Sequence, residues 1–336
     1  MSEFRIDQIK SQDASRGPDV AGITTFTGTS GIVMPSGDTA YRGGRGRGVF
    51  GGGGFPTNYN IIDYVTIATL GNALDFGDLT TSSPLTASCS SSIRGLWAGD
   101  FPSASNKIDY VTISSTGNAF DFGDRTVSMF NAAGLANNTR GVFAGGAGPA
   151  QTDVIDFVTI ATLGNATLFG NLSVATSGLS ACASSTRGII GGGFSPQTST
   201  DIENTINYIT ISTLGNAQNF GDLTQARTNL TSLSNATRGI FAGGNTDPTK
   251  VDTIDYITIA SLGDAIDFGN LLSAVDTSAS VASPLRGIVA GGLSPAETDV
   301  IQYITISTTG NAVDFGDLTQ ARHSPRGCSD SHGGLS

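Results

Sequence analysis

Short apolar runs, separated by polar and glycine-rich turns, recur along this chain at a nearly constant interval. The clearest run is Arg140-Gly-Val-Phe-Ala-Gly-Gly146, and each of its copies begins with an arginine followed by a glycine. These arginines lie 47, 46, 47, 51 and 48 residues apart, at Arg47, Arg94, Arg140, Arg187, Arg238 and Arg286. A period near fifty that is built from short apolar runs is typical of a β-propeller and not of a helical repeat. We therefore expect an all-β fold with six blades.

Each repeat is expected to form four β-strands, and the fourth copy shows them most clearly. Strand A is predicted over 179–185, strand B over 187–193, strand C over 205–211 and strand D over 216–220. Small residues in strand A suit a position near the axis, and β-branched and aromatic residues in strand C suit a sheet that is covered on both faces. Strand D is expected to end in a phenylalanine that packs between blades, at Phe76, Phe122, Phe169, Phe220, Phe268 and Phe315.

The turn between strands C and D carries Gly followed by Asn or Asp in every copy, as in Gly215-Asn216. This pair predicts a tight hairpin whose glycine has a positive φ. The A–B and C–D turns should share one face of the propeller, and the B–C and D–A connections should share the other.

The C-terminal segment is predicted to close the ring. Nothing before Arg47 resembles strand A, whereas the last repeat continues beyond strand D. Aligning 318–322 with 223–227 places Cys328 in a strand A, so the C-terminal strand would complete the first blade and remove a free sheet edge. The same alignment predicts three buried cysteines and no disulfide, at Cys89, Cys182 and Cys328.

Residues 1–40 do not follow the repeat, so we divide the chain into a leader, 1–40, and a propeller, 41–336. The leader contains short apolar stretches separated by Gly and Pro, and this pattern predicts short β-strands. Some forty residues cannot bury a stable core alone. The leader should therefore dock on its own propeller, assemble with copies of itself or bind another protein, using the apolar residues Phe4, Ile6, Ile9, Phe26 and Met34.

Charge and composition argue against nucleic-acid binding and against insertion into a membrane. The net charge is −11 and the chain has three lysines, Lys10, Lys107 and Lys250, which argues against a nucleic-acid partner. The N-terminus lacks a basic segment followed by an apolar one, and no apolar run approaches the ~18 residues of a membrane span. We expect no membrane insertion, and we expect the protein to be made in a cytoplasm.

Catalytic or metal chemistry needs suitable side chains brought together, and the sequence offers few. His323 and His332 fall in the closing segment, and the cysteines fall in separate blades. We therefore predict no enzyme, no cofactor and no zinc or copper site. Aspartates recur in most blades and are expected to satisfy backbone donors or to pair with the repeat arginines, with calcium binding as an alternative: Asp63, Asp109, Asp156, Asp255, Asp78, Asp124, Asp222 and Asp317.

The face formed by the B–C and D–A connections varies among the repeats, while the other face is nearly uniform. Loops on a rigid scaffold often carry specificity, although drift in unconstrained loops explains the same variation. The candidate partner-binding residues on this variable face are Phe55, Asn58, Tyr59, Phe101, Asn106, Phe194, Gln197, Asn245 and Asp247.

The repeat resembles a kelch-type unit. It has a Leu-Thr-x-Ala-Arg segment, an apolar strand that ends in Gly-Gly, an Asp-Tyr pair and an aromatic residue on strand D, where Phe220 stands in place of the usual tryptophan. More specifically, 140–146, 62–69 and 310–318 resemble repeats in virion proteins of marine cyanobacterial phages. The opening Met1-Ser-Glu-Phe-Arg5 and Met34-Pro-Ser-Gly37 resemble the leader of the same proteins.

This resemblance implies a kelch-like propeller that serves as a non-enzymatic structural protein of the phage particle. Its place would be the tail or an external appendage, such as a tail fibre or adaptor. Its partners would be other virion proteins, copies of itself, or a glycan or protein on the host surface. A free carbohydrate-binding or sugar-active propeller is the alternative, and a cellular scaffold is a third.

Overall fold

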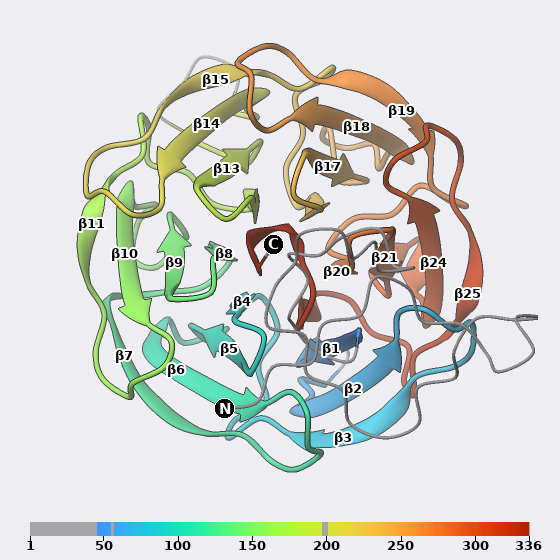
Figure 1. The fold of residues 1–336 in the computed structure, drawn as a ribbon, viewed down its shortest axis with the longest axis horizontal. Coiled ribbons are helices and arrows are strands. Elements are labelled where there is room, and N and C mark those ends of the chain that lie inside the picture. The colour runs from blue at the N-terminus through green and yellow to red at the C-terminus, as the bar shows by residue number, and fades with distance from the viewer. Residues whose placement is uncertain (1–45, 55–56, 197–200, 336) are drawn as a thin grey trace, which may run out of the picture. The chain divides into compact units, whose positions relative to one another are not determined.

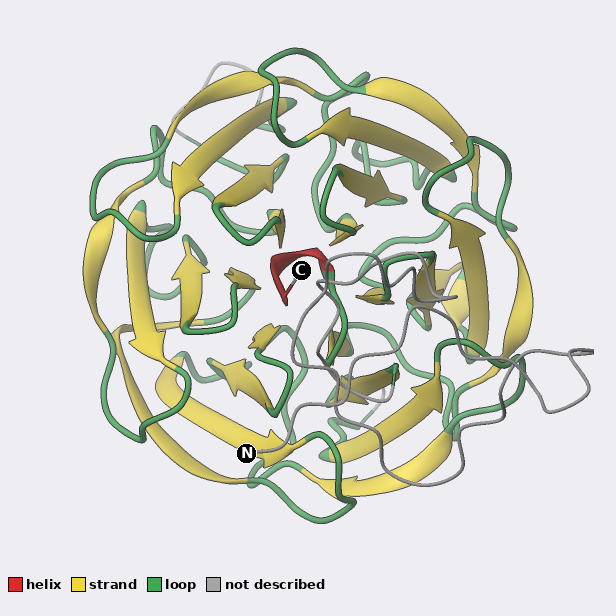
Figure 2. Ribbon diagram, in the orientation of Figure 1, coloured by secondary structure: helices red, strands yellow, loops and turns green. Residues whose placement is uncertain are grey.

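Six four-stranded antiparallel sheets stand in a ring and form a six-bladed β-propeller (Figure 1). The structure is a computed structural model, which describes residues 46–54, 57–196 and 201–335. Strands and loops make up almost all of these residues (Figure 2). The six blades and their four strands are those that the repeat predicts. The leader, together with Phe55 and Gln197, lies outside the described residues.

Strands A to D follow one another from the axis to the rim of each blade. For blades 1 to 6 in order, the A strands are β26 (Arg326–Ser329), β4 (Ala87–Ser90), β8 (Ala133–Ala136), β12 (Ser180–Ala183), β16 (Thr231–Ser234) and β20 (Ala279–Ala282). The B strands are β1 (Arg47–Gly51), β5 (Arg94–Ala98), β9 (Arg140–Ala144), β13 (Arg187–Gly191), β17 (Arg238–Ala242) and β21 (Arg286–Ala290).

The C strands are β2 (Ile61–Thr66), β6 (Ser105–Thr112), β10 (Val154–Thr159), β14 (Thr205–Thr210), β18 (Thr253–Thr258) and β24 (Val300–Thr305). The D strands are β3 (Leu74–Asp78), β7 (Phe120–Met129), β11 (Thr167–Asn171), β15 (Gln218–Asp222), β19 (Ile266–Asn270) and β25 (Val313–Asp317). Two further elements are a short hairpin, β22 (Leu293–Ser294) with β23 (Ala296–Glu297), and a 3₁₀ turn, η1 (Gly333–Leu335).

The C-terminal strand closes the ring, as the sequence predicts. Strand β26 pairs antiparallel with β1, and the register sets Val49 opposite Cys328. Asp330, which follows β26, continues this contact, since its Oδ1 accepts a hydrogen bond from the Arg47 N–H at 2.9 Å. Blade 1 is therefore built from both ends of the propeller sequence, and its innermost strand is not covalently continuous with the rest of the blade.

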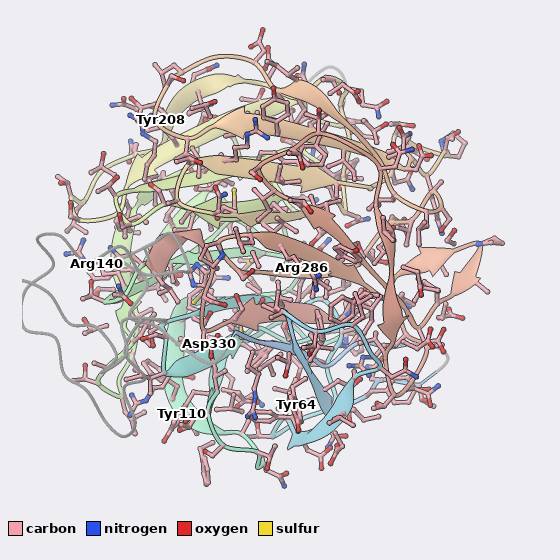
Figure 3. The ribbon with its side chains drawn as sticks, turned by 45° about the vertical axis from the view of Figure 1, so that its right-hand side comes forward. Tyr64, Tyr110, Arg140, Tyr208, Arg286 and Asp330 are labelled. Atoms are coloured by element: carbon pink, nitrogen blue, oxygen red, sulfur yellow. The ribbon has the colours of Figure 1, made fainter. Side chains whose placement is uncertain are left out.

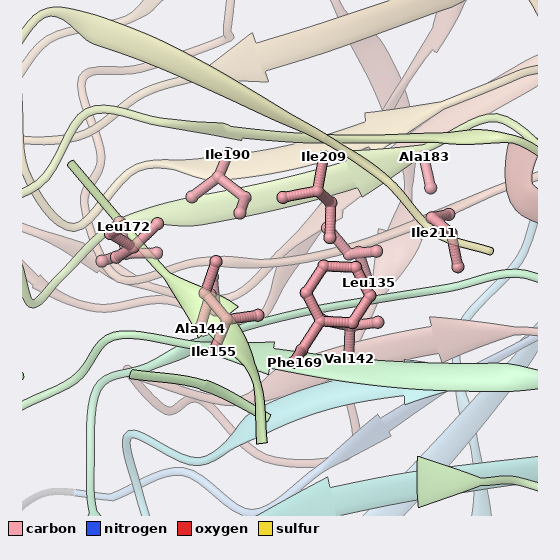
Figure 4. Close-up of a cluster of buried hydrophobic side chains, with 12 residues drawn as sticks. Leu135, Val142, Ala144, Ile155, Phe169, Leu172, Ala183, Ile190, Ile209 and Ile211 are labelled. Atoms are coloured by element: carbon pink, nitrogen blue, oxygen red, sulfur yellow. The ribbon is translucent and has the colours of Figure 1, made fainter. Parts of the chain in front are cut away.

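The hydrophobic core consists of six clusters, one at each junction between neighbouring blades. Figure 4 shows the cluster between blades 3 and 4, where Val142 and Phe169 of one blade meet Ile190 and Ile209 of the next. The phenylalanines of the D strands are buried in these clusters, as predicted. Each blade is thus stabilised by its neighbours, in the manner of other repeat proteins.

A close contact between blades explains the glycine that follows each repeat arginine. The third residue of every A strand packs against the glycine of strand B in the next blade. A Cβ on Gly95 would lie 2.7 Å from the Sγ of Cys328, and one on Gly141 would lie 2.8 Å from the Sγ of Cys89. Because real Cβ atoms do not approach so closely, glycine leaves the space that the neighbouring side chain fills.

The three cysteines should be unreactive in the folded protein. All three are free and buried, and burial raises the pKa of the Cys182 thiol to about 12 and that of the other two further. Because the thiolate is the reactive form, we expect a thiol-specific reagent at pH 8 to label less than about a tenth of the cysteines in the native protein within an hour. All three should react at once after unfolding in denaturant. Rapid labelling of the native protein would show that the blades open locally.

Strand D and the turn before it differ from the prediction. In blade 4 strand D covers Gln218–Asp222 instead of 216–220, so Phe220 lies in its middle and not at its end. The connection from strand C is no tight hairpin, since it spans 211–217. Its Gly215 has the predicted positive φ, but Asn216 acts between blades, where its Oδ1 accepts a hydrogen bond from the Asn171 N–H at 3.1 Å.

This link between blades is repeated around the whole rim. In each copy the glycine N–H of the C–D turn donates to the carbonyl of the phenylalanine on strand D of the preceding blade, at 2.7 to 3.0 Å. The Gly-Asn pair therefore ties neighbouring blades together at their outer strands.

A second hydrogen-bonded ring surrounds the axis. The residue two positions before each A strand has a φ between 52° and 65°. Its N–H donates to the carbonyl of the matching residue in the preceding blade. The six bonds measure 2.6 to 3.3 Å and form a closed cycle, which we call the axial ring: Leu85, Asn131, Gly178, Asn229, Thr277 and Ser324.

Candidate functional site

The described residues that we predicted for partner binding are distributed over the B–C connections of several blades. Asn58 is exposed, and its Nδ2 donates to the carbonyl of Phe101 at 3.3 Å, which joins blades 1 and 2. Phe101 is half-buried, because its ring meets Phe130 edge-on with 5.0 Å between the centroids. Phe101 is therefore a packing residue as well as a loop residue.

The other predicted residues that the structure describes make no side-chain hydrogen bond to a neighbouring blade. Asp247 is exposed, and its N–H donates to Asn245 Oδ1 at 2.6 Å within one compact turn. Phe194 and Tyr59 are half-buried. Asn106 lies inside strand β6 and not in a loop. Asn58 and Phe101 are thus the pair that the structure brings together across blades.

The opposite face carries most of the exposed large apolar side chains. We call the face of the A–B and C–D turns the turn face and the other one the loop face. Of the twelve exposed large apolar residues in the described chain, Leu272 belongs to the loop face and eleven lie in turns of the turn face or at the adjacent start of strand D. These eleven are Leu70, Leu163, Leu214, Leu262, Ile93, Leu285, Leu74, Phe120, Leu168, Ile266 and Val313.

These residues are not among the site residues predicted from the sequence, although the sequence carries a signal for them. Leucine recurs before the Gly-Asn or Gly-Asp pair in four of the six C–D turns, where a turn open to solvent ordinarily carries a polar residue. Single exposed apolar residues are common on protein surfaces and need no explanation. Their recurrence at matching positions of one face is what distinguishes this surface.

The repeat arginines make the turn face rigid. Each guanidinium lies over the strand C aromatic ring of its own blade, with 4.4 to 4.9 Å from Cζ to the ring centroid. Its Nη1 also donates to a backbone carbonyl at the end of strand C in the next blade, as from Arg140 to Ile211 at 2.8 Å. Figure 3 labels two of these arginines, Arg140 and Arg286. It also labels three of the stacked rings, Tyr64, Tyr110 and Tyr208, which belong to other blades.

The predicted pairing of these arginines with the recurrent aspartates is therefore wrong in part. The strand C aspartates satisfy backbone donors, as expected, but their cations come from elsewhere. Arg227 Nη2 contacts Asp255 at 2.7 Å, Arg322 Nη1 contacts Asp63 at 3.0 Å, and Arg125 Nε contacts Asp156 at 3.1 Å. In these three pairs both side chains are fully buried, and the cation follows the strand D phenylalanine of the preceding blade: Arg125 lies within β7, and Arg227 and Arg322 lie in D–A segments. The repeat arginines do not pair with these aspartates, since each lies instead over the aromatic ring of strand C.

Charge is balanced at this strand C position in every blade. The fourth aspartate, Asp109, pairs with Lys107 at 3.3 Å. At the two remaining positions an amide replaces the carboxylate, and the hydrogen-bond partners there are neutral. Ser173 donates to Asn207 Oδ1, and the Leu272 N–H donates to Gln302 Oε1. A buried carboxylate thus occurs where a cation accompanies it, because an uncompensated buried charge is strongly unfavourable.

A channel runs along the axis between the six A strands. Two cavities lie along it, and residues such as Ser232 and Gly327 line both of them. Small residues line it. At the turn-face end His332 follows β26, its Nε2 donates to the Ser90 carbonyl at 2.8 Å, and the Gly334 N–H donates to its Nδ1 at 3.1 Å. These two bonds require a neutral imidazole, in keeping with the pKa of His332, which burial lowers.

The turn η1 follows His332 and lies at the centre of the ring, where Figure 2 draws it in red. It contacts β8, β12 and β16, which belong to blades distant from β26 in the sequence. A Cβ on Gly334 would lie 1.8 Å from the carbonyl oxygen of Ala136, so the segment fits closely against the channel wall.

In the part of the chain that the structure describes, no group of three or more His, Cys, Asp or Glu side chains is placed to hold a metal ion. The same residues contain no helix of the length and hydrophobicity that a membrane crossing requires. A scan against protein-family models matched no family, and a search of curated proteins found no similar sequence.

Proposed function

We propose that this chain is a non-enzymatic structural protein of a bacteriophage particle, located in the tail or an external appendage, and that its propeller binds another virion protein through the turn face. The observation that carries this proposal is the set of eleven exposed apolar side chains on or beside that face. Large apolar patches on a surface are typical of protein–protein interaction sites. The virion context rests on the resemblance of the repeats and the leader to phage proteins.

The rigidity of the turn face supports a role in assembly. Arginine stacking and the hydrogen bonds between blades hold the turns in place, so a partner would meet a surface that needs little ordering. Less ordering lowers the entropic cost of binding. The leader would anchor or oligomerise the protein, and the loop face would stay available for a glycan or protein of the host surface.

The proposal predicts that the protein is incorporated into particles through the turn face. We would change Leu70, Leu163 and Leu214 together to Ser in the phage that encodes the chain, and measure the protein in gradient-purified particles by quantitative immunoblotting. Because burying a leucine stabilises a contact by ~1.5 to 3 kcal/mol, we expect incorporation to fall at least about tenfold. The melting temperature of the isolated variant should not change, since the three side chains are exposed in the free protein.

The matched control is Leu272→Ser, which makes the same change on the loop face and should leave incorporation intact. Normal incorporation of the triple variant would remove the turn face from the proposal. Purified particles without the protein would refute the virion role. In that case, binding of the isolated chain to a glycan array would favour a lectin, and turnover of a sugar would favour an enzyme.

A further inference from the structure

The axial channel contains one permanent charge. Arg326 begins strand β26 and lines the channel at its loop-face end. The matching first residues of the other A strands are small and uncharged: Ala87, Ala133, Ser180, Thr231 and Ala279. Among the described residues that line either cavity, there is no aspartate, glutamate or lysine. Arg326 therefore departs from the repeat at the most confined position in the blade.

Arg326 has no carboxylate partner in the described structure. Its Nη1 donates to the Pro325 carbonyl at 3.3 Å and its Nη2 donates to Asn131 Oδ1 at 3.1 Å. A guanidinium carries five N–H groups, so three stay without a protein acceptor in the described structure. The three fully buried arginines, Arg125, Arg227 and Arg322, each contact an aspartate, whereas the partly buried Arg326 does not.

The free energy of this arrangement favours an added anion. Burial lowers the pKa of Arg326 to about 10, so the side chain is charged at neutral pH. A charge that is removed from water without a counter-ion destabilises a protein unless something compensates it. The side chain keeps contact with the channel, so a mobile ion can supply that compensation.

The surroundings suit an oxyanion. Asn131 also donates from Nδ2 to Asn229 Oδ1 at 3.1 Å, which fixes the amide that faces Arg326. Hydroxyl groups line the wall, and Ser180 and Ser232 lie 2.7 Å apart with either able to donate. The axial ring surrounds this end of the channel, and its N–H groups are already paired with carbonyls. The Ser88 and Ser280 hydroxyls likewise donate to the carbonyls of Gly327 and Ser232. Recognition would therefore depend on the guanidinium, with one hydroxyl of the Ser180–Ser232 pair as a further donor.

We propose that the axial channel is a binding site for a small oxyanion of the size of phosphate, held by Arg326. Guanidinium groups bind such anions through paired, charge-assisted hydrogen bonds. The space that this cavity leaves for water-sized molecules is ≈ 50 Å³, which suits a small free ion and excludes a large ligand.

Equilibrium dialysis of the full chain against radiolabelled inorganic phosphate tests this directly. The ionic strength is matched with sodium gluconate, whose anion is much larger. We expect about one phosphate per chain for the wild type and none for Arg326→Ser, which copies Ser180 of blade 4. Arg140→Gln, a change on the turn face, is the control and should bind like the wild type.

Thermal unfolding gives a second measurement. A ligand that binds the folded state alone stabilises it, so 10 mM phosphate should raise the melting temperature of the wild type by at least about 2 °C. Arg326→Ser should melt no lower than the wild type without phosphate and should not respond to it. Absence of bound phosphate on the wild type, or equal binding by a folded Arg326→Ser protein, would overturn the proposal. The dialysis of the wild type decides the matter even if the variant does not fold.

Discussion

Deleting residues 323–336 is expected to lower the melting temperature of the protein by more than ~10 °C or to make it insoluble, which corresponds to a loss of about 3 kcal/mol or more. The deletion removes strand β26, leaves one edge of β1 unpaired and opens the cluster that contains Val49, Trp97 and Cys328. An exposed strand edge also invites pairing with other chains, so aggregation should accompany the loss. Differential scanning calorimetry and the soluble yield would measure both effects.

A shorter deletion separates the two parts of this segment. Removing residues 333–336 takes away the turn η1 but keeps β26 and its pairing with β1. We expect this variant to stay soluble and to lose a few degrees, because it loses the contacts of η1 with three A strands. An unchanged melting temperature after the longer deletion would refute the closure of the ring by the C-terminal strand.

Breaking the buried Arg227–Asp255 pair should have the second largest effect. Asp255→Gln leaves the guanidinium of Arg227 buried without its counter-ion, and removal of one partner from such a pair costs about 3 to 5 kcal/mol. Urea unfolding, with folding followed by tryptophan fluorescence and circular dichroism, would give the change in the free energy of unfolding. A cost below about 1 kcal/mol would contradict the account of balanced charge.

Another junction of the propeller suggests a second substitution that should restore the stability of the Asp255→Gln variant. At the junction of blades 5 and 6 the equivalent residues are Val275 and Gln302, which form an uncharged arrangement. The double variant Arg227→Val with Asp255→Gln copies that junction, so it should recover most of the stability that either single change loses. As a control, Ser173→Ala removes one neutral hydrogen bond at another junction and should cost only about 1 kcal/mol.

The repeat made the architecture predictable, because each copy confirms the others. The number of blades, the order of their strands and the closure at Cys328 all follow from one alignment of the sequence with itself, and the structure confirms them. The bounds of strand D were less accurate, since a glycine such as Gly221 normally ends a strand. Here it permits a bulge, and its φ of 154° brings the backbone close to the turn of the next blade.

Contacts that depend on backbone conformation could not be foreseen. The axial ring is formed by residues as different as Leu85, Asn131 and Gly178, so no recurring side chain marks it in the sequence. The partners of the buried aspartates were also hidden, since Arg125 reaches its aspartate from within strand β7, whereas Arg227 reaches the matching position from a D–A segment. In both cases the three-dimensional position is repeated and the residue type is not.

The candidate sites were predictable to a smaller extent. Variation among the repeats directed attention to the loop face, whereas the exposed leucines stand in turns whose sequence is nearly constant. The alignment that placed Cys328 in a strand A did not single out Arg326, because an alignment alone does not show that a side chain lines a channel without a counter-ion.

The position of β1 has a mechanical consequence. The chain enters β1 at its turn-face end, and the strand is hydrogen-bonded to β2 on one side and to β26 on the other. A pulling force that is applied through the residues before Arg47, along the direction of the strand, would load both rows of hydrogen bonds in shear. Bonds loaded in shear must break together, while bonds that are peeled break one after another. A propeller held in this way could withstand tension on its N-terminal connection that would separate an ordinary edge strand.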